Sequence, residues 1–141
     1  MGLTGVKAFD TTIHTTNVWL NDLMDELGWH NRTQAYHAIR VVLHGLRDCL
    51  PTGEAANLAA QLPMLVGGFY YEGWTPGRTP YRERKRRKFL SHVGGALRCD
   101  KDEEAERIAR AVFRFLSNHI TTGKIKDIKR DLPNELCDLW R

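Results

Sequence analysis

The sequence predicts an all-α protein, a helical bundle built from two repeated three-helix units related by internal duplication. Apolar residues recur at steps of three and four, as from Ala35 to Leu50, which is the spacing of one helix face. No segment sustains an alternation of apolar and polar residues, so we expect no β-sheet. A shift of 70 residues brings apolar and turn positions of the second half onto those of the first, which indicates a repeat.

In the first half we expect three helices. The first, at about 12–27, carries apolar residues from Ile13 to Leu27 on one side. The second, at about 33–50, follows a possible cap at Asn31 or Thr33 and ends before Pro51, which cannot continue a helix. The third, at about 53–62, is short and rich in alanine, and Pro63 stops it.

The second half repeats this order, with helices expected at about 81–97, 102–120 and 122–132. Asp102 and its two acidic neighbours lie in the first turn of the middle helix, where the helix dipole favours negative charge. A closing turn or short helix is expected at 134–140. The turn residues agree with the repeat, since Thr52-Gly53 falls on Thr122-Gly123 and Leu62-Pro63 falls on Leu132-Pro133.

A connector at 67–80 separates the two units and is expected to be an ordered loop. It combines several glycines and prolines with four aromatic side chains, and disordered linkers rarely carry so many aromatics. The whole chain, 1–141, then forms a single domain, with repeat one at about 12–66 and repeat two at about 81–136. Each unit has an apolar face that it cannot cover alone, so we expect the two units to pack together.

Composition excludes several classes of protein. With 42% hydrophobic and 27% charged residues, the chain is typical of a soluble globular domain. Its three cysteines have no Cys-x-x-Cys spacing, which argues against a disulfide framework or a zinc ribbon and favours the reducing cytoplasm. We expect no signal peptide and no transmembrane segment, because the apolar runs are too short.

No motif of catalysis, cofactor binding or metal binding is found, so we expect a protein that is not an enzyme and has no cofactor. His30, His37 and His44 recur every seven residues. That spacing separates neighbours by about 10.5 Å along a helix, too far to share a metal ion. Arg40 and Arg110 occupy equivalent positions, and we expect each to brace its own unit by hydrogen bonds rather than to bind an anion.

A basic segment supplies the net charge of +4. Between positions 82 and 88 the chain has six positive groups and one negative group, so the rest is close to neutral. Its charges lie all round a predicted helix, and we therefore expect its first two turns to project beyond the bundle. The candidate binding residues are these cations and the neighbouring aromatics, on which nucleic-acid bases could stack: Arg82, Arg84, Lys85, Arg86, Arg87, Lys88, Tyr70, Tyr71 and Trp74. The competing interpretation is a solvated charge run that only aids solubility.

Three motifs give the chain a family resemblance. They are Ala-Ala-Gln-Leu-Pro at 59–63, Gly-Phe-Tyr-Tyr-Glu-Gly-Trp at 68–74 and Asp-Leu-Pro-Asn-Glu-Leu at 131–136. Together they resemble the bacterial family called domain of unknown function 2267, which implies an all-helical bacterial protein and assigns no catalytic residue.

These observations favour a non-catalytic protein-interaction or scaffold module of the bacterial cytoplasm, with a protein partner or self-association. The exposed connector aromatics and the basic segment would be its contact surfaces. The alternative is a nucleic-acid or polyanion binder that uses the basic segment.

Overall fold

The computed structural model describes residues 2–80 and 84–141, and within these ranges it contains helices and no strand. The prediction of an all-α fold is therefore confirmed for the described residues. The α-helices are α1 (Lys7–Leu27), α2 (Arg32–Asp48), α3 (Thr52–Ala59), α4 (Met64–Tyr71), α5 (Arg86–Leu97), α6 (Asp102–His119), α7 (Thr122–Asp131) and α8 (Asn134–Cys137). Short 3-10 turns, η1 (Pro76–Arg78) and η2 (Asp138–Trp140), follow α4 and α8.

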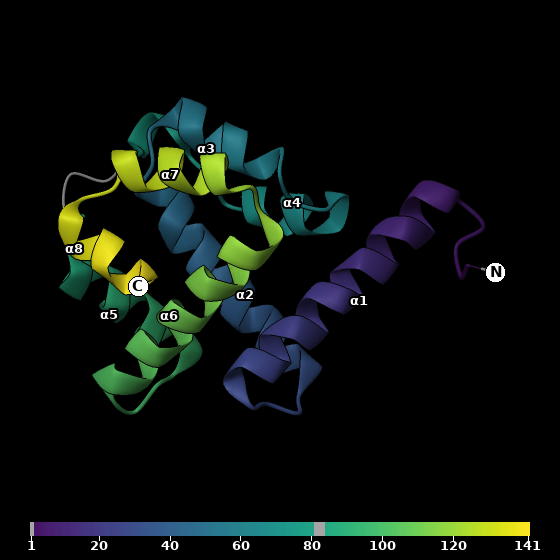
Figure 1. Cartoon of the computed structure of the whole chain (residues 1–141), viewed down its shortest axis with the longest axis horizontal. Helices are drawn as coiled ribbons and strands as arrows, with labels where there is room; N and C mark the ends of the chain where they lie inside the picture. The colour runs from purple at the N-terminus through teal and green to yellow at the C-terminus, as the bar shows by residue number, and fades with distance from the viewer. Residues whose placement is uncertain (1, 81–83) are drawn as a thin grey trace.

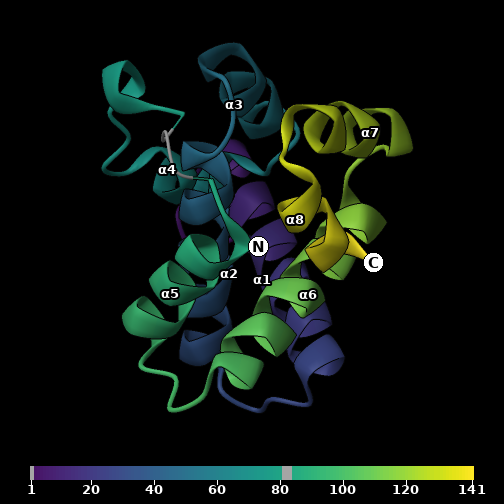
Figure 2. The ribbon, with the colours of Figure 1, turned by 90° about the vertical axis from the view of Figure 1, so that its left-hand side faces the viewer.

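Helices α2 and α6 form the centre of the molecule (Figure 1). Each contacts the other, and both contact α1 and α5, while α4 covers α2 and η2 covers α6. Helices α3 and α7 lie next to each other at one end of the bundle (Figure 2). The loops that join α1 to α2 and α5 to α6 lie at the opposite end.

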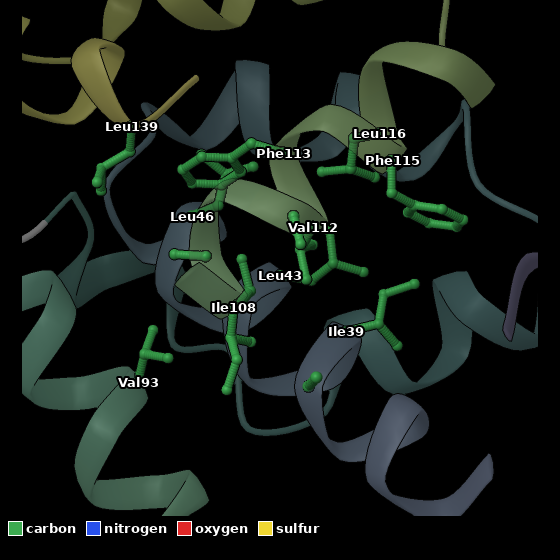
Figure 3. Packing of buried hydrophobic residues seen from close by; sticks show 14 of the residues in the cluster. Ile39, Leu43, Leu46, Val93, Ile108, Val112, Phe113, Phe115, Leu116 and Leu139 are labelled. Atoms are coloured by element: carbon green, nitrogen blue, oxygen red, sulfur yellow. The ribbon is translucent and has the colours of Figure 1, made fainter. Parts of the chain in front are cut away.

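The core is built where the apolar faces of α2 and α6 meet (Figure 3). Ile39, Leu43 and Leu46 come from α2, and Ile108 and Val112 come from α6. All five side chains are buried. The amphipathic spacing read from the sequence therefore identifies the sides of these two helices that face inward.

Helix α1 begins earlier than predicted, at Lys7 instead of residue 12. It ends at Gly28, whose φ of 68° is the left-handed conformation that glycine adopts without strain. Its second half packs against the bundle through Leu23 and Leu27. Its first half extends away from the body of the molecule (Figure 1).

The expectation of a loop from 67 is wrong for its first residues, because α4 continues to Tyr71. Gly67 and Gly68 lower helix propensity, but tertiary contacts compensate for this. Arg47 of α2 donates hydrogen bonds to the carbonyl oxygens of Tyr70, at 2.6 Å, and Glu72, at 2.9 Å. These bonds satisfy the C-terminal end of α4, so the first half of the chain has four helices instead of three.

The second half also departs from its expected bounds at the start. Helix α5 begins at Arg86, and neither Arg84 nor Lys85 is helical. The predicted residues 81–83 lie outside the described part of the chain. Helix starts in the two halves are nevertheless 70 residues apart in three cases, namely Arg32 and Asp102, Thr52 and Thr122, and Met64 and Asn134.

Candidate interaction surface

The basic segment does not project freely from the bundle. Arg84 is partly buried, and its Nη1 donates to the carbonyl oxygens of Cys49, at 3.1 Å, and Asp131, at 3.2 Å. It thereby joins the residues that follow α2 to the end of α7. Arg82 lies outside the described residues.

Arg86 is also held within the molecule. Its guanidinium donates to the carboxylate of Glu106, which accepts a second hydrogen bond from Arg110 Nε at 2.9 Å. The hydrogen bonds from Arg110 and Arg86 lower the pKa of Glu106 from its usual value. Arg86 therefore belongs to an internal ionic cluster, and the expectation that it extends toward a partner is wrong.

Three cations of the segment remain on the surface, namely Lys85, Arg87 and Lys88. Lys85 and Lys88, together with Arg84, line an open cavity of about 560 Å³ whose apolar side includes Phe89. The positive surface is therefore smaller than the sequence indicates, because two of its arginines are used to hold the fold together.

The predicted stacking aromatics are placed in three different environments. Tyr70 is completely buried, and its hydroxyl donates to the carbonyl oxygen of Ala55 at 2.7 Å. Its proposed contact with a partner is therefore ruled out by burial. Tyr71 is exposed, and its ring centroid lies 5.4 Å from that of Trp74. Trp74 is half-buried and donates from Nε1 to Thr79 Oγ1 at 3.3 Å.

An apolar surface that the sequence did not predict lies across α1 and α4. We call it the α1–α4 face and define it by four exposed apolar side chains: Val6, Phe9, Met64 and Leu65. Phe9 is 50% exposed and Met64 is 60% exposed. The signal that could have revealed it is the i, i+4 step from Phe9 to Ile13, which continues the apolar stripe of α1 toward the N-terminus.

A groove of about 710 Å³ runs between the two helices of this face. Its walls are mostly apolar and include Phe9, Ile13, Leu20, Met64, Leu65 and Phe69. The backbone N–H of Leu65 donates to Thr12 Oγ1 at 2.9 Å, which fixes α4 against α1. The groove is therefore built by a defined contact between the two helices.

The histidines with heptad spacing have separate environments. His30 and His37 are exposed, while His44 is half-buried and its Nε2 lies 2.6 Å from the carbonyl oxygen of Phe69. Burial lowers the pKa of His44. Among the described residues, no three His, Cys, Asp or Glu side chains gather in a way that could hold a metal ion.

The two repeated arginines both make contacts within their own half. Arg110 donates to Glu106 and to the carbonyl oxygen of Asp138 at 2.9 Å. Arg40 Nη2 lies 3.7 Å from Glu72 Oε1, which is a long ion pair. A brace by Arg40 is therefore much weaker than that by Arg110.

Within residues 2–80 and 84–141, no helix has both the length and the apolar character needed to cross a membrane. The family model described as "Uncharacterized conserved protein (DUF2267)" matches residues 16–139. The chain therefore belongs to this family. No curated protein matches it.

Proposed function

We propose that this DUF2267 protein is a non-catalytic protein-interaction module that contacts its partner through the α1–α4 face. The observation that carries the proposal is the grouping of four exposed apolar side chains around a formed groove. Single exposed apolar residues are common on protein surfaces, whereas a contiguous group marks a contact surface. The place of action is the bacterial cytoplasm that the composition predicts.

Substitutions on the two sides of α1 test this proposal. Phe9→Asp and Met64→Glu place charges on the α1–α4 face, whereas Val18→Asp is the matched control because Val18 is 40% exposed on the opposite side of α1. Sedimentation measures self-association, and cross-linking in cells followed by mass spectrometry measures other contacts. We expect Phe9→Asp and Met64→Glu to abolish the contacts that Val18→Asp retains. Equal contacts in all three variants would contradict the proposal.

A second candidate function is polyanion binding, favoured by the cavity lined by Arg84, Lys85 and Lys88. It ranks below the first because Arg84 and Arg86 already have partners within the molecule. The test is binding of a single-stranded RNA and a DNA duplex at increasing salt. Replacing Lys85, Arg87 and Lys88 by alanine should remove the binding and its salt dependence if this candidate is right.

We also infer that the chain is an internal duplication, with a copy in each half. The equal 70-residue offset between helix starts supports this, as does the order of contacts, since α1 packs on α2 and α6 while α5 packs on α6 and α2. A further support is the ion pair between Glu54 and Lys124, which joins α3 to α7 at 3.2 Å. Positions that are equivalent in two related halves can meet only at the axis between them.

A further inference from the structure

The two halves treat one set of equivalent positions differently. In the second half, the carboxylate of Glu106 is held between Arg86 and Arg110. The positions 70 residues earlier are occupied by Thr16, Tyr36 and Arg40. The first half therefore keeps one arginine of the cluster and has no acidic side chain at the position of Glu106.

This difference leaves two buried polar atoms without partners. Thr16 is 7% exposed, and neither its Oγ1 nor the Nε of Arg40 meets a hydrogen-bond partner among the described residues. In the second half the corresponding Nε, that of Arg110, donates to Glu106 at 2.9 Å. Buried polar groups are nearly always paired, so an acceptor is missing here.

Both groups lie at the groove of the α1–α4 face. Thr16, Tyr36 and Glu72 line the groove, and Arg40 contacts Glu72 at 3.7 Å. Glu72 follows α4 and is exposed, so its side chain can move aside at little cost. The arginine N–H and the threonine and tyrosine hydroxyls can all donate hydrogen bonds, and the arginine is a permanent cation. The group that completes this set is a carboxylate.

We propose that the partner of the α1–α4 face inserts an Asp or Glu side chain, carried between apolar residues of a helical segment, into this groove. Its carboxylate takes the place that Glu106 occupies in the second half and binds Arg40 and Thr16. The apolar residues on either side cover Phe9, Met64 and Leu65. This inference rests on the proposed function, and it specifies the chemistry of the partner.

The extent of the apolar surface favours a polypeptide over a small acid. Exposed apolar side chains continue beyond the groove to Val6 and Leu3. A small molecule in the groove would leave these side chains in water, whereas an amphipathic helix lying along α1 would cover them.

Selection from a phage-displayed library of random peptides, about three helical turns long, tests the proposal with the whole chain as bait. We expect selected peptides to share apolar positions at helical spacing and one Asp or Glu. Changing that acid to its amide should weaken binding at least roughly tenfold, as loss of a charged hydrogen bond does. The same change should have little effect on binding to Arg40→Met or, in part, to Thr16→Val. Arg114→Met is the matched control, since Arg114 is an exposed arginine paired with Glu26, and it should discriminate as the native chain does.

The outcomes separate the two proposals. Peptides that bind the α1–α4 face without preferring an acid, or that still prefer it with Arg40→Met, overturn the inference and leave the interaction surface standing. A library that yields no peptide sensitive to Phe9→Asp overturns both. Decanoate is the remaining probe: if it shifts the amide resonances of Thr16 and Arg40 while no acidic peptide does, the site takes a small acid and the proposed partner is wrong.

Discussion

Burial controls the chemistry of the ionisable side chains in this protein. Cys49 follows α2 and is almost completely buried. Its pKa is raised to about 11, mainly because burial disfavours the thiolate. The pKa values of Cys99 and Cys137 are also raised by burial, although both side chains are partly exposed.

We therefore predict that Cys49 is the slowest of the three cysteines to react with iodoacetamide in the folded protein. The thiolate is the reactive form, and Cys49 has both little thiolate at neutral pH and little access to the reagent. Mass spectrometry of timed labelling measures the three rates. Urea should bring the rates together, and labelling of Cys49 as fast as Cys99 without urea would contradict the prediction.

His44 makes stability depend on pH. Its pKa is lowered in the folded state, chiefly by burial, so the unfolded chain takes up the proton first as the pH falls below about 6.5. Protonation then favours unfolding, and the free energy of unfolding should decrease between neutral pH and about pH 5. The carbonyl oxygen of Phe69 accepts from Nε2 at 2.6 Å, so the neutral ring carries its hydrogen on that atom.

The variant His44→Gln keeps a donor near Phe69 and removes the titration. We expect its stability, measured by urea unfolding across this pH range, to change less with pH than that of the native protein. His37→Gln is the control, because His37 is an exposed histidine on the same helix. A pH dependence equal to that of the native protein in His44→Gln would show that another group titrates.

At the scale of elements, α4 depends on its neighbours for its structure. Arg47 is a buried arginine that bonds Asp48 through two nitrogens and also reaches the end of α4. The sequence contains the residues of α4 but not the reason for its helicity, since glycine at 67 and 68 predicts a loop. The hydrogen bonds that stabilise it come from a helix more than twenty residues away in the chain.

Replacing Arg47 by methionine should therefore affect α4 first. We expect a loss of about 3–5 kcal/mol of stability, the usual effect of removing one partner of a buried ion pair. Hydrogen exchange should show faster opening of 64–72 than of α6. Arg114→Met breaks an exposed pair with Glu26 and should cost less than about 1 kcal/mol. Uniform protection in Arg47→Met would contradict the stated role.

The basic segment shows the same limit at element scale. Its charges are visible in the sequence, but Arg84 and Arg86 find their acceptors on α2, α6 and α7 or directly after them. No spacing rule within the segment predicts such acceptors, because they are brought close only by the packing of other helices. The exposed remainder, Lys85, Arg87 and Lys88, could be identified only after those contacts were known.

At the scale of the whole molecule, the pair formed by Glu54 and Lys124 joins the two halves. Both side chains are mostly buried, and Lys124 also lies 3.6 Å from Asp127. Glu54→Lys and Lys124→Glu each place like charges together and should destabilise the protein by about 1–3 kcal/mol.

The double exchange restores opposite charges at equivalent positions, so it should recover at least half of the summed loss. Urea unfolding of the four proteins gives the coupling energy. Lys126→Glu, an exposed change on α7, should stay within about 0.5 kcal/mol of the native protein. Additive losses in the double variant would show that the two side chains do not act together.

The sequence by itself determined the helical class, the inward faces of α2 and α6, and the 70-residue offset of the helix starts. These properties follow from spacing along a single helix or from comparison of the chain with itself, and neither requires knowledge of neighbours. Tertiary structure alone decided that Tyr70 is buried, that Arg86 is paired, and that Phe9 and Met64 form an exposed surface beside a groove. The physical reason is that periodicity shows that a helix has an apolar face, whereas the packing of other helices decides how much of that face is covered.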